Sequence, residues 1–490
     1  MDEQSLRKKN LIMFPLGTVG RDMVYNIFTN FLLTFILFTR SLSAAQLAAI
    51  TAIMVAARIF DALNDPIMGN IIERTRTRWG KFKPWLVIGI LLTSVIVYLT
   101  FNTDLQGWSF VWFFGVIYFM FSIAYTMHDI SYWGMVPALS SDAHARDQFA
   151  ARATLFAGIG GTAASVLIPI LTTGEHALGG STVTAYGIVA TVIAILAPLF
   201  LCFTIFGVRE KREYTDAPPI SFKKIWTTIT GNDQLLWISL IFLIQQIGNG
   251  IVIGGIGSTY IYFDFGYDGG LYSIFTTVGM VATAFLMIFY PTISKRISRK
   301  KLMSIMAVTS LTGYVVMLLP GLLLETSMLK FWIIVIGFML SNFGQYGFYL
   351  VMMISIINTV EYNEYRFGTR DEAIISSLRP FLTKLASALI VAITSASYLI
   401  FGVTDYTNEI SAFERASTQG LVTEAEKLSG ISQLLQGVTH GQSLGLLLCM
   451  TVLPCALMLT SYFLYKKHYK LDEEEYDRIC AEIEARKVST

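Results

Sequence analysis

Long apolar stretches recur along the whole chain and are separated by mostly short polar segments. A helix needs about 20 mostly apolar residues to cross the hydrocarbon core of a bilayer, and this sequence offers that pattern repeatedly. Sliding an apolar window along the chain predicts twelve membrane-spanning helices. Their expected ranges are 12–38, 46–71, 84–103, 108–137, 150–173, 182–207, 235–263, 270–294, 302–324, 329–358, 372–402 and 441–466.

Lysine and arginine gather in every second polar segment. The segment 73–83, ERTRTRWGKFK, carries five basic residues, and further clusters lie at 208–224 and 295–301. The alternate segments, such as NTDLQG, TTGEHALGGS and LLETS, contain neither residue. Because basic segments stay on the cytoplasmic side, we expect a multi-pass protein of the cell membrane with both termini in the cytoplasm.

The arrangement of basic clusters also repeats. The clusters at 73–83 and 295–301 follow the second span of the first six and the second span of the last six. Two six-helix halves of like topology are the plan of the major facilitator superfamily, whose substrate sites lie near the midplane between the halves. Another twelve-span transporter or a channel is the alternative. We expect an N-terminal half at 1–207, a cytoplasmic linker at 208–234, a C-terminal half at 235–466 with an external loop at 403–440, and a cytoplasmic tail at 467–490.

Composition supports an all-α integral membrane protein, since 54% of the 490 residues are hydrophobic and 14% are charged. The four cysteines fall in apolar spans or in the tail, so no disulfide framework is implied. No phosphate-binding G-x-x-x-x-G-K-[ST] motif occurs, and nothing resembles a nucleic-acid-binding surface. The small residues of GIGGTA (158–163) predict close helix packing. We therefore expect neither an enzyme nor a resident cofactor.

Two carboxylates lie one helical turn apart inside an apolar stretch, at Asp61 and Asp65. A charge at the centre of a membrane helix costs roughly 2.5–3.5 kcal/mol, so the pair needs a compensating partner. Arg58 shares their helix face, and a buried salt bridge is the structural alternative to a cation site. One arginine cannot neutralise both acids, and Asn64 adds an amide oxygen suited to Na⁺ or Li⁺. Pro66 frees a further backbone carbonyl one turn earlier.

A second polar face lies in YTMHDISYW, where Thr126, Asp129 and Trp133 follow at helical spacing. A carboxylate beside an aromatic plane suits a sugar, because the acid accepts hydrogen bonds from hydroxyl groups and the ring covers the C–H face. An aromatic residue in the membrane core or interface is the alternative. His128 points off this face and is expected to pack.

Other polar residues lie within the expected spans. Arg21 and Asp22 are in the first span, Arg152 is near the start of the fifth, and Lys384 is twelve residues inside the eleventh. A lysine at that depth should pair with an acid across the bundle, such as Asp61 or Asp129. The loop at 403–440, with an amphipathic stretch in TEAEKLSGISQLLQ, and the charged helix of the tail are expected to be solvated surface.

These motifs resemble the glycoside–pentoside–hexuronide:cation symporter family, to which the melibiose permease belongs. The resemblance rests on ARIFDALNDPIMG, TRTRWGKFKPW, YTMHDISYW and EYNEYRFGTRDEA leading to FLTKLAS, in this order through most of the chain. It implies cation-coupled sugar symport by alternating access. It also implies a sugar or glycoside, a monovalent cation and the lipid bilayer as partners, and we expect the protein to act as a monomer.

The resemblance assigns roles residue by residue. Tyr349 falls where the melibiose permease has a tryptophan, and the 403–440 loop is an elaboration that this permease lacks. The family's basic position in the fifth span falls at Thr154 by straight count. The implied cation site for Na⁺, Li⁺ or H⁺ comprises Asp61, Asn64, Asp65 and Thr126; the implied substrate site comprises Arg21, Asp22, Asp129, Trp133, Arg152, Tyr349 and Lys384; the implied cytoplasmic gate comprises Glu361, Glu364, Arg370 and Glu372.

Two other functions stay open at this stage. A carrier of the same fold could take an amphipathic lipid or drug, which predicts a more apolar cavity than Asp22, Asp129 and Trp133 suggest. A membrane sensor could bind a glycoside and signal through the charged tail. Counterflow of a labelled sugar separates a sugar transporter from both.

Overall fold

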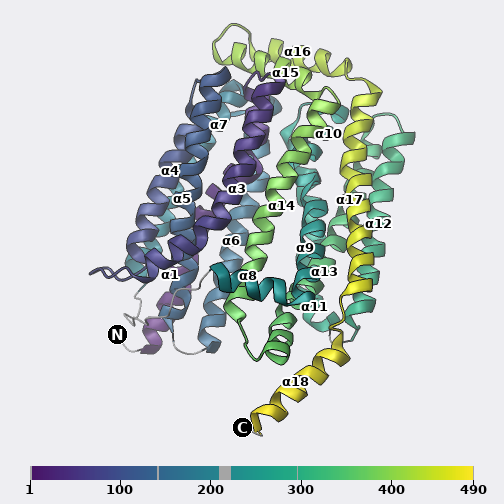
Figure 1. Cartoon of the computed structure of the whole chain (residues 1–490). Helices are drawn as coiled ribbons and strands as arrows, with labels where there is room; N and C mark the ends of the chain where they lie inside the picture. Colours follow the sequence, from purple (N-terminus) through teal and green to yellow (C-terminus); the bar gives the residue numbers. More distant parts are fainter. Residues whose placement is uncertain (1–2, 141–142, 209–221, 295, 489–490) are drawn as a thin grey trace. The chain divides into compact units, whose positions relative to one another are not determined.

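The computed structural model describes residues 3–140, 143–208, 222–294 and 296–488, and within these ranges the chain is helical with no strand (Figure 1). The chain divides into two compact units. Unit 1 comprises Met1–Ala217, Ile261–Ser273 and Tyr398–Thr439, and unit 2 comprises Pro218–Tyr260, Ile274–Ser397 and His440–Thr490.

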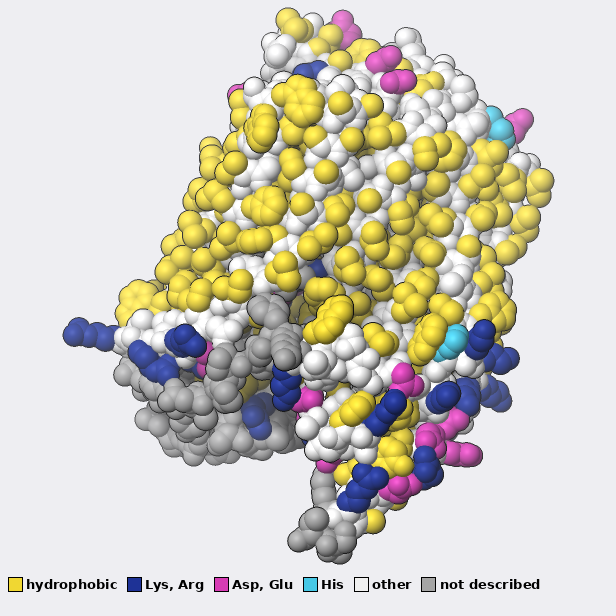
Figure 2. All heavy atoms as spheres, in the orientation of Figure 1, with side chains coloured by type: hydrophobic (Ala, Val, Ile, Leu, Met, Phe, Trp, Pro, Cys, Tyr) yellow, Lys and Arg dark blue, Asp and Glu magenta, His cyan; other side chains and the backbone are white. Residues whose placement is uncertain are grey.

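The expected membrane-spanning helices are present. Among the described residues, eleven helices are long and apolar enough to cross a membrane, or twelve if one bent pair counts as a single span. The prediction of an all-α integral membrane fold is therefore confirmed. Hydrophobic side chains cover the lengths of the helices on the face drawn in Figure 2, while charged side chains gather at the helix ends.

Unit 1 contains the first six spans. Its first span is broken at Phe31, where two helices meet at 49°, although neither proline nor glycine marks this position in the sequence. The helices are α1 (Glu3–Asn30), α2 (Leu32–Thr39), α3 (Ala44–Glu73), α4 (Lys83–Asn102), α5 (Gly107–Leu139), α6 (Ala143–Thr172) and α7 (Thr182–Gly207), with short 3₁₀ turns at Gly174–His176 and Leu178–Gly180.

Glycine lets two helices of unit 1 approach closely. A Cβ atom on Gly160 of α6 would lie 2.2 Å from the backbone oxygen of Val19 on α1. No side chain fits there, so Gly160 serves the close helix packing that the sequence predicts for GIGGTA, whereas Gly158 has no atom within 4 Å of its Cβ position.

Most of unit 2 is built from the later spans. The seventh span of the chain contains a short π-helix. Gly255 within it has φ 125°, a conformation that glycine adopts at little cost. The helices that lie wholly or largely in this unit are α8 (Phe222–Gly231), α9 (Asp233–Gly250), the π-helix (Val252–Ile256), α11 (Gly269–Ser294), α12 (Arg299–Leu323), α13 (Met328–Phe367), α14 (Glu372–Ile400), α17 (His440–His468) and α18 (Glu473–Val488). Helix α10 (Gly257–Phe265) begins in unit 2 and ends in unit 1.

The tail is less solvated than expected. Helix α18 buries Ile479 and Ile483 in the apolar core of unit 2, so one face of this charged helix packs while the other carries its acids. Its start is held by Lys300, whose ammonium lies 2.6 Å from the carboxylate of Asp472. The side chain of Asp472 also accepts a hydrogen bond from the backbone N–H of Glu475, which caps the helix.

The expected external loop is also folded. It forms α15 (Val403–Thr418) and α16 (Glu424–Gln436), and both belong to unit 1 although the neighbouring helices α14 and α17 belong mainly to unit 2. In Figure 1 these two helices lie beside the ends of α3 and α7. The loop packs because Ile410 and Ile431 are buried beneath its polar surface.

Candidate functional site

A cluster of oxygen atoms joins α3 to α5 in unit 1. Asp61 is buried, and its Oδ1 accepts hydrogen bonds from the hydroxyls of Ser122 at 2.6 Å and Thr126 at 3.1 Å. The Thr126 hydroxyl also lies 3.2 Å from Oδ1 of Asp65. The two acids face α5 together because they are four residues apart on α3. Thr126 thus bridges the carboxylates that the sequence predicts to bind a cation.

Two further side chains of α3 lie near this cluster. Asn64 is 8% exposed, and its side-chain nitrogen has no hydrogen-bond partner among the described residues. Arg58 is 6% exposed, and its guanidinium lies over the Tyr118 ring, 5.9 Å from the centroid. An aromatic face attracts the guanidinium charge and helps to hold it inside the protein.

A second cluster joins α1 to α5 and centres on Arg21. The guanidinium of Arg21 donates to Asp22 at 2.7 and 2.9 Å and to Asp129 at 3.0 Å. Arg21 itself is 4% exposed, whereas the side chains of Asp22 and Asp129 are 21% and 38% exposed. The arginine therefore holds both acids in place and leaves part of each carboxylate open to a ligand.

Aromatic rings border the Arg21 cluster. The guanidinium carbon lies 5.3 Å from the ring centroids of both Tyr132 and Trp133. Tyr132 is held by a hydrogen bond from its hydroxyl to the backbone oxygen of Phe14 on α1. Trp133 is partly exposed.

The two clusters share α5. Thr126 and Asp129 are three residues apart on this helix, which corresponds to an axial rise of about 4.5 Å. Both sets of side chains therefore depend on the position of one rigid element.

Some candidate residues of unit 1 lie elsewhere. Arg152 is exposed and donates to the backbone oxygen of Leu11 at 3.3 Å, while Thr154 donates to Ala150 of its own helix. Neither joins the Arg21 cluster through these hydrogen bonds. His128 is fully buried against α4, with Nδ1 3.1 Å from the backbone oxygen of Leu86, as expected for a packing residue.

The remaining substrate candidates belong to unit 2. Tyr349 is partly buried on α13, and its ring centroid is 5.8 Å from that of Phe242 and 5.6 Å from that of Tyr346. Lys384 is partly buried on α14. Tyr349 thus provides an aromatic surface, and Lys384 a positively charged side chain, within unit 2.

The four residues expected to form a gate meet around Arg370. Its guanidinium lies 2.7 Å from Glu361, 3.0 Å from Glu364 and 3.2 Å from Glu372. Hydrogen bonding to Glu372, then the charge of Glu361 and hydrogen bonding to Glu364, raise the pKa of Arg370 above its usual value, although partial desolvation opposes this. Helix α13 runs nine residues beyond the expected end of its span, at 358, and this extension carries both of its glutamates.

Ser122 is the residue of the cluster around Asp61 and Asp65 that the sequence interpretation missed. It precedes Thr126 by four residues, so helical spacing already places both hydroxyls on one face of α5. The central role of Arg21, which the resemblance gave only as a basic neighbour of Asp22, could not be read from spacing because its contact with Asp129 joins two helices.

Comparison with known proteins identifies the family of this chain. Residues 13–473 match the model of the family described as MFS/sugar transport protein. The lactose permease of Leuconostoc lactis is 30% identical over 80% of this chain and 63% of its own length. The raffinose carrier protein of Pediococcus pentosaceus is 27% identical over 96% of this chain and 71% of its own length.

The fold has solved counterparts as well. A bacterial homologue of the human lysosomal transporter Spinster, in an inward-facing and unoccupied conformation, has a TM-score of 0.59 at 13% identity over 95% of this chain and 98% of its own. The chain spans less than two thirds of the length of the Leuconostoc permease. The two curated relatives are named as a permease and a carrier, not as enzymes. The family predicted from the helix motifs is confirmed, and the chain belongs to the MFS/sugar transport protein family.

Proposed function

We propose that this chain is a secondary transporter that carries a sugar or glycoside across the cell membrane together with a monovalent cation, Na⁺, Li⁺ or H⁺. The observation that carries the proposal is the placement of two acid clusters, around Thr126 and Asp129, on neighbouring turns of α5. Family membership and the names of the lactose and raffinose relatives support a sugar as the cargo.

The cluster on α3 and α5 suits a small, hard cation. Asp61, Asp65 and Thr126 present oxygen atoms, which are the ligands that alkali-metal and other hard cations prefer. Two carboxylates that share a site repel each other when both are charged. A bound cation relieves this repulsion, whereas the single hydrogen of the Thr126 hydroxyl can serve one carboxylate at a time.

The cluster on α1 and α5 suits a sugar. The partly exposed carboxylates of Asp22 and Asp129 can accept hydrogen bonds from sugar hydroxyls. Trp133 can cover the less polar face of the ring with its indole. Arg21 positions both acids through its hydrogen bonds. If a bound sugar displaces one of these bonds, the released N–H group of Arg21 can donate to a sugar oxygen.

Coupling follows from the shared helix. A cation that draws Asp61 and Asp65 toward Thr126 fixes α5, and the same helix places Asp129 for the sugar. By thermodynamic linkage, the sugar must strengthen cation binding by the factor by which the cation strengthens sugar binding. In alternating access, loaded and empty carriers cross between the two faces of the membrane, and the cation gradient drives uptake.

Counterflow in proteoliposomes tests the proposal. The purified protein should exchange labelled lactose or raffinose against the same sugar trapped inside, and Na⁺ or Li⁺ should raise sugar affinity. Asp129→Cys should weaken sugar binding about tenfold or more, because a hydrogen bond to a charged group is worth about 1.5–3 kcal/mol. Asp104→Cys, which changes an exposed acid in a loop, is the matched control.

Each result has a separate meaning. If no sugar from a panel of glycosides, pentosides and uronides shows counterflow, the proposal of sugar transport is wrong, and a non-sugar carrier or a sensor becomes the better explanation. Counterflow that ignores Na⁺, Li⁺ and pH would remove cation coupling alone.

A further inference from the structure

The segment 403–436, here called the strap, is joined at both ends to helices that belong mainly to unit 2 but packs within unit 1. It comprises α15, α16 and the turn between them. Two groups of its hydrogen bonds reach other parts of unit 1, at the residues between α2 and α3 and around the start of α7.

The first contact is with the turn that follows α2. The Asn408 side chain accepts from the backbone N–H of Leu42 at 2.8 Å and donates to the backbone oxygen of the same residue at 2.9 Å. Beside it, the hydroxyls of Ser41 and Ser411 lie 3.1 Å apart, and Arg415 donates to Ser41 at 2.6 Å. The amide thus satisfies both polar backbone groups of Leu42, as a neighbouring strand would.

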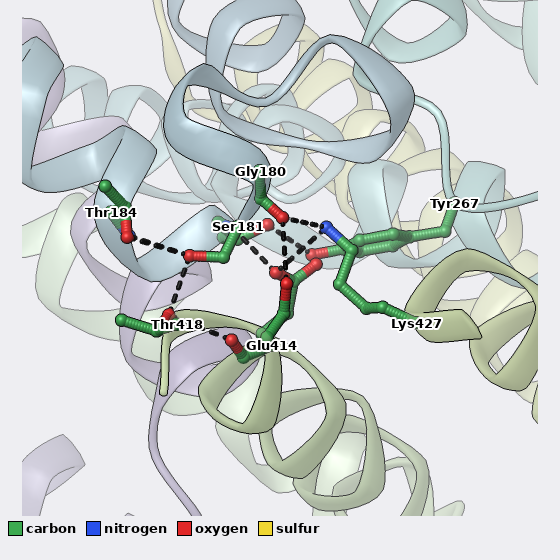
Figure 3. Close-up of polar contacts among 9 residues, drawn as sticks. Gly180, Ser181, Thr184, Tyr267, Glu414, Thr418 and Lys427 are labelled. Carbon is green, nitrogen blue, oxygen red and sulfur yellow. Dashed lines mark hydrogen bonds and ion pairs between the residues drawn. The ribbon is translucent and has the colours of Figure 1, made fainter. Parts of the chain in front are cut away.

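The second contact is at the start of α7 (Figure 3). Glu414 accepts from the backbone N–H of Thr182 at 2.7 Å, where the helix dipole favours a negative charge. Lys427 donates to the backbone oxygen of Gly180 at 2.8 Å and lies 3.4 Å from the Glu414 carboxylate. Thr418 and Ser181 add a hydroxyl pair at 2.7 Å.

The charges of this second contact are fully enclosed. The side chains of Glu414 and Lys427 are both 0% exposed. Undocking would have to open two charges and several backbone groups to water together, which makes it a concerted event rather than a local fraying. The strap is therefore held as a structural part of unit 1.

The joints at either end of the strap are short. Gly402 precedes α15 with φ 64°, a left-handed conformation that glycine tolerates, and residues 437–439 separate α16 from α17. The Gly437 backbone oxygen accepts from the Tyr406 hydroxyl at 2.6 Å, which ties the second joint back to the strap.

We propose that the strap stays docked on unit 1 throughout the transport cycle, so that the joints at residues 401–402 and 437–439 absorb whatever motion unit 2 makes relative to it. This inference rests on the proposed transport function, because it concerns what moves while sugar crosses the membrane. Helices α15 and α16 would then move with unit 1, although their position in the sequence, between α14 and α17, suggests that they move with unit 2.

Cross-linking the strap to unit 1 tests the inference. Ser41→Cys combined with Ser411→Cys, with the four native cysteines replaced by alanine, places two thiols where the hydroxyls are 3.1 Å apart, within reach of a disulfide. The oxidised double variant should keep lactose counterflow within about twofold of its reduced form, since a docked strap loses no needed freedom. The two single-cysteine variants under the same oxidant are the controls.

Thiol accessibility gives a second readout that needs no transport. In the same cysteine-free background, the thiol of Ser411→Cys should stay unreactive toward a membrane-impermeant maleimide with and without lactose and Na⁺, because Ser411 is 0% exposed. Ser432→Cys, on the exposed face of α16, should react in every condition. Adding Glu414→Gln to the Ser411→Cys variant should raise its labelling at least tenfold by loosening the strap.

Two outcomes would overturn the inference. One is a loss of counterflow of tenfold or more on oxidation that a reductant restores. The other is rapid labelling of the thiol at position 411 once sugar and cation are added. A reduced double variant with no counterflow of any sugar would count against the transport proposal instead, and the labelling result would still decide whether the strap stays docked.

Discussion

The Thr126 hydroxyl carries one hydrogen and lies within 3.2 Å of two carboxylates, those of Asp61 and Asp65. The Ser122 hydroxyl adds a second hydrogen bond to the first of these acids, at 2.6 Å. At the scale of single residues, the site is therefore built as an acid fixed by two hydroxyls and a second acid that shares one of them.

Replacing Asp65 tests whether this residue is needed for cation-driven accumulation of sugar. In Asp65→Cys, we expect cation-dependent accumulation of sugar to disappear, because one of the two charges that hold the cation is gone. Uptake of lactose into energised vesicles, with and without a Na⁺ gradient, measures this. Na⁺-driven accumulation that persists in the variant would refute the assignment of Asp65, and Asp104→Cys should behave like the wild type.

Ser122 gives a finer test of the same cluster. Removal of a residue that orients a metal ligand typically costs about 10- to 100-fold in metal affinity. We therefore expect Ser122→Ala to raise the Na⁺ concentration that half-maximally stimulates sugar binding by about tenfold. Ser131→Ala is the matched control, since this serine is buried on the same helix and its hydroxyl has no hydrogen-bond partner among the described residues. Equal effects of both substitutions would speak for general helix packing.

At the scale of elements, hydrophobic pattern predicted most of the helices but few of their irregularities. The spans at 84–103 and 182–207 correspond closely to α4 and α7, because long apolar runs have little alternative in a bilayer. The break at Phe31 and the π-helix around Gly255 have no counterpart in the prediction. The extension of α13 was missed because its last turns are polar.

The tail helix offers a pH-dependent test at this scale. The hydrogen bond from Lys300, together with the N–H of Glu475, holds the pKa of Asp472 below its usual value. A lowered pKa in the docked state stabilises docking above the normal pKa of an aspartic acid, and this contribution is lost as the pH falls through the lowered value. We expect α18 to loosen toward acid pH.

Amide hydrogen exchange of residues 473–488, corrected for its intrinsic pH dependence, measures this loosening. Asp472→Asn should loosen α18 already at neutral pH while keeping a side chain that can cap the helix. Glu474→Gln removes a charge from an exposed neighbour and should leave exchange unchanged. A pH-independent tail in the wild type would show that the Lys300–Asp472 pair contributes little.

At the scale of the whole molecule, the candidate residues divide between the two units. Arg21, Asp22, Asp61, Asp65 and Asp129 lie in unit 1, and their mutual contacts were partly predictable, since spacing along α3 and α5 places the acids on shared faces. The docking of the strap was not predictable. Contacts such as that between Asn408 and Leu42 join residues 366 positions apart and leave no periodic trace in the sequence.

Orientation in the membrane can be tested on the intact molecule. The distribution of basic segments predicts a cytoplasmic tail and an external strap. In whole cells, a membrane-impermeant maleimide should therefore label Ser432→Cys directly and should reach the native Cys480 of α18 only after permeabilisation. Labelling of Cys480 in sealed cells would reverse the assigned topology.

The bend at Phe31 divides the first span into two mechanical parts. The first part, α1, carries Arg21 and Asp22. All eight residues of the second part, α2, are buried, and the turn that follows α2 contacts the strap. In a straight helix, any tilt of the α1 end would also move the α2 end. A helix interrupted at Phe31 allows α1 to change its tilt while α2 stays in place. A substitution that straightens this junction should therefore restrict the motion of α1 without changing any candidate site residue.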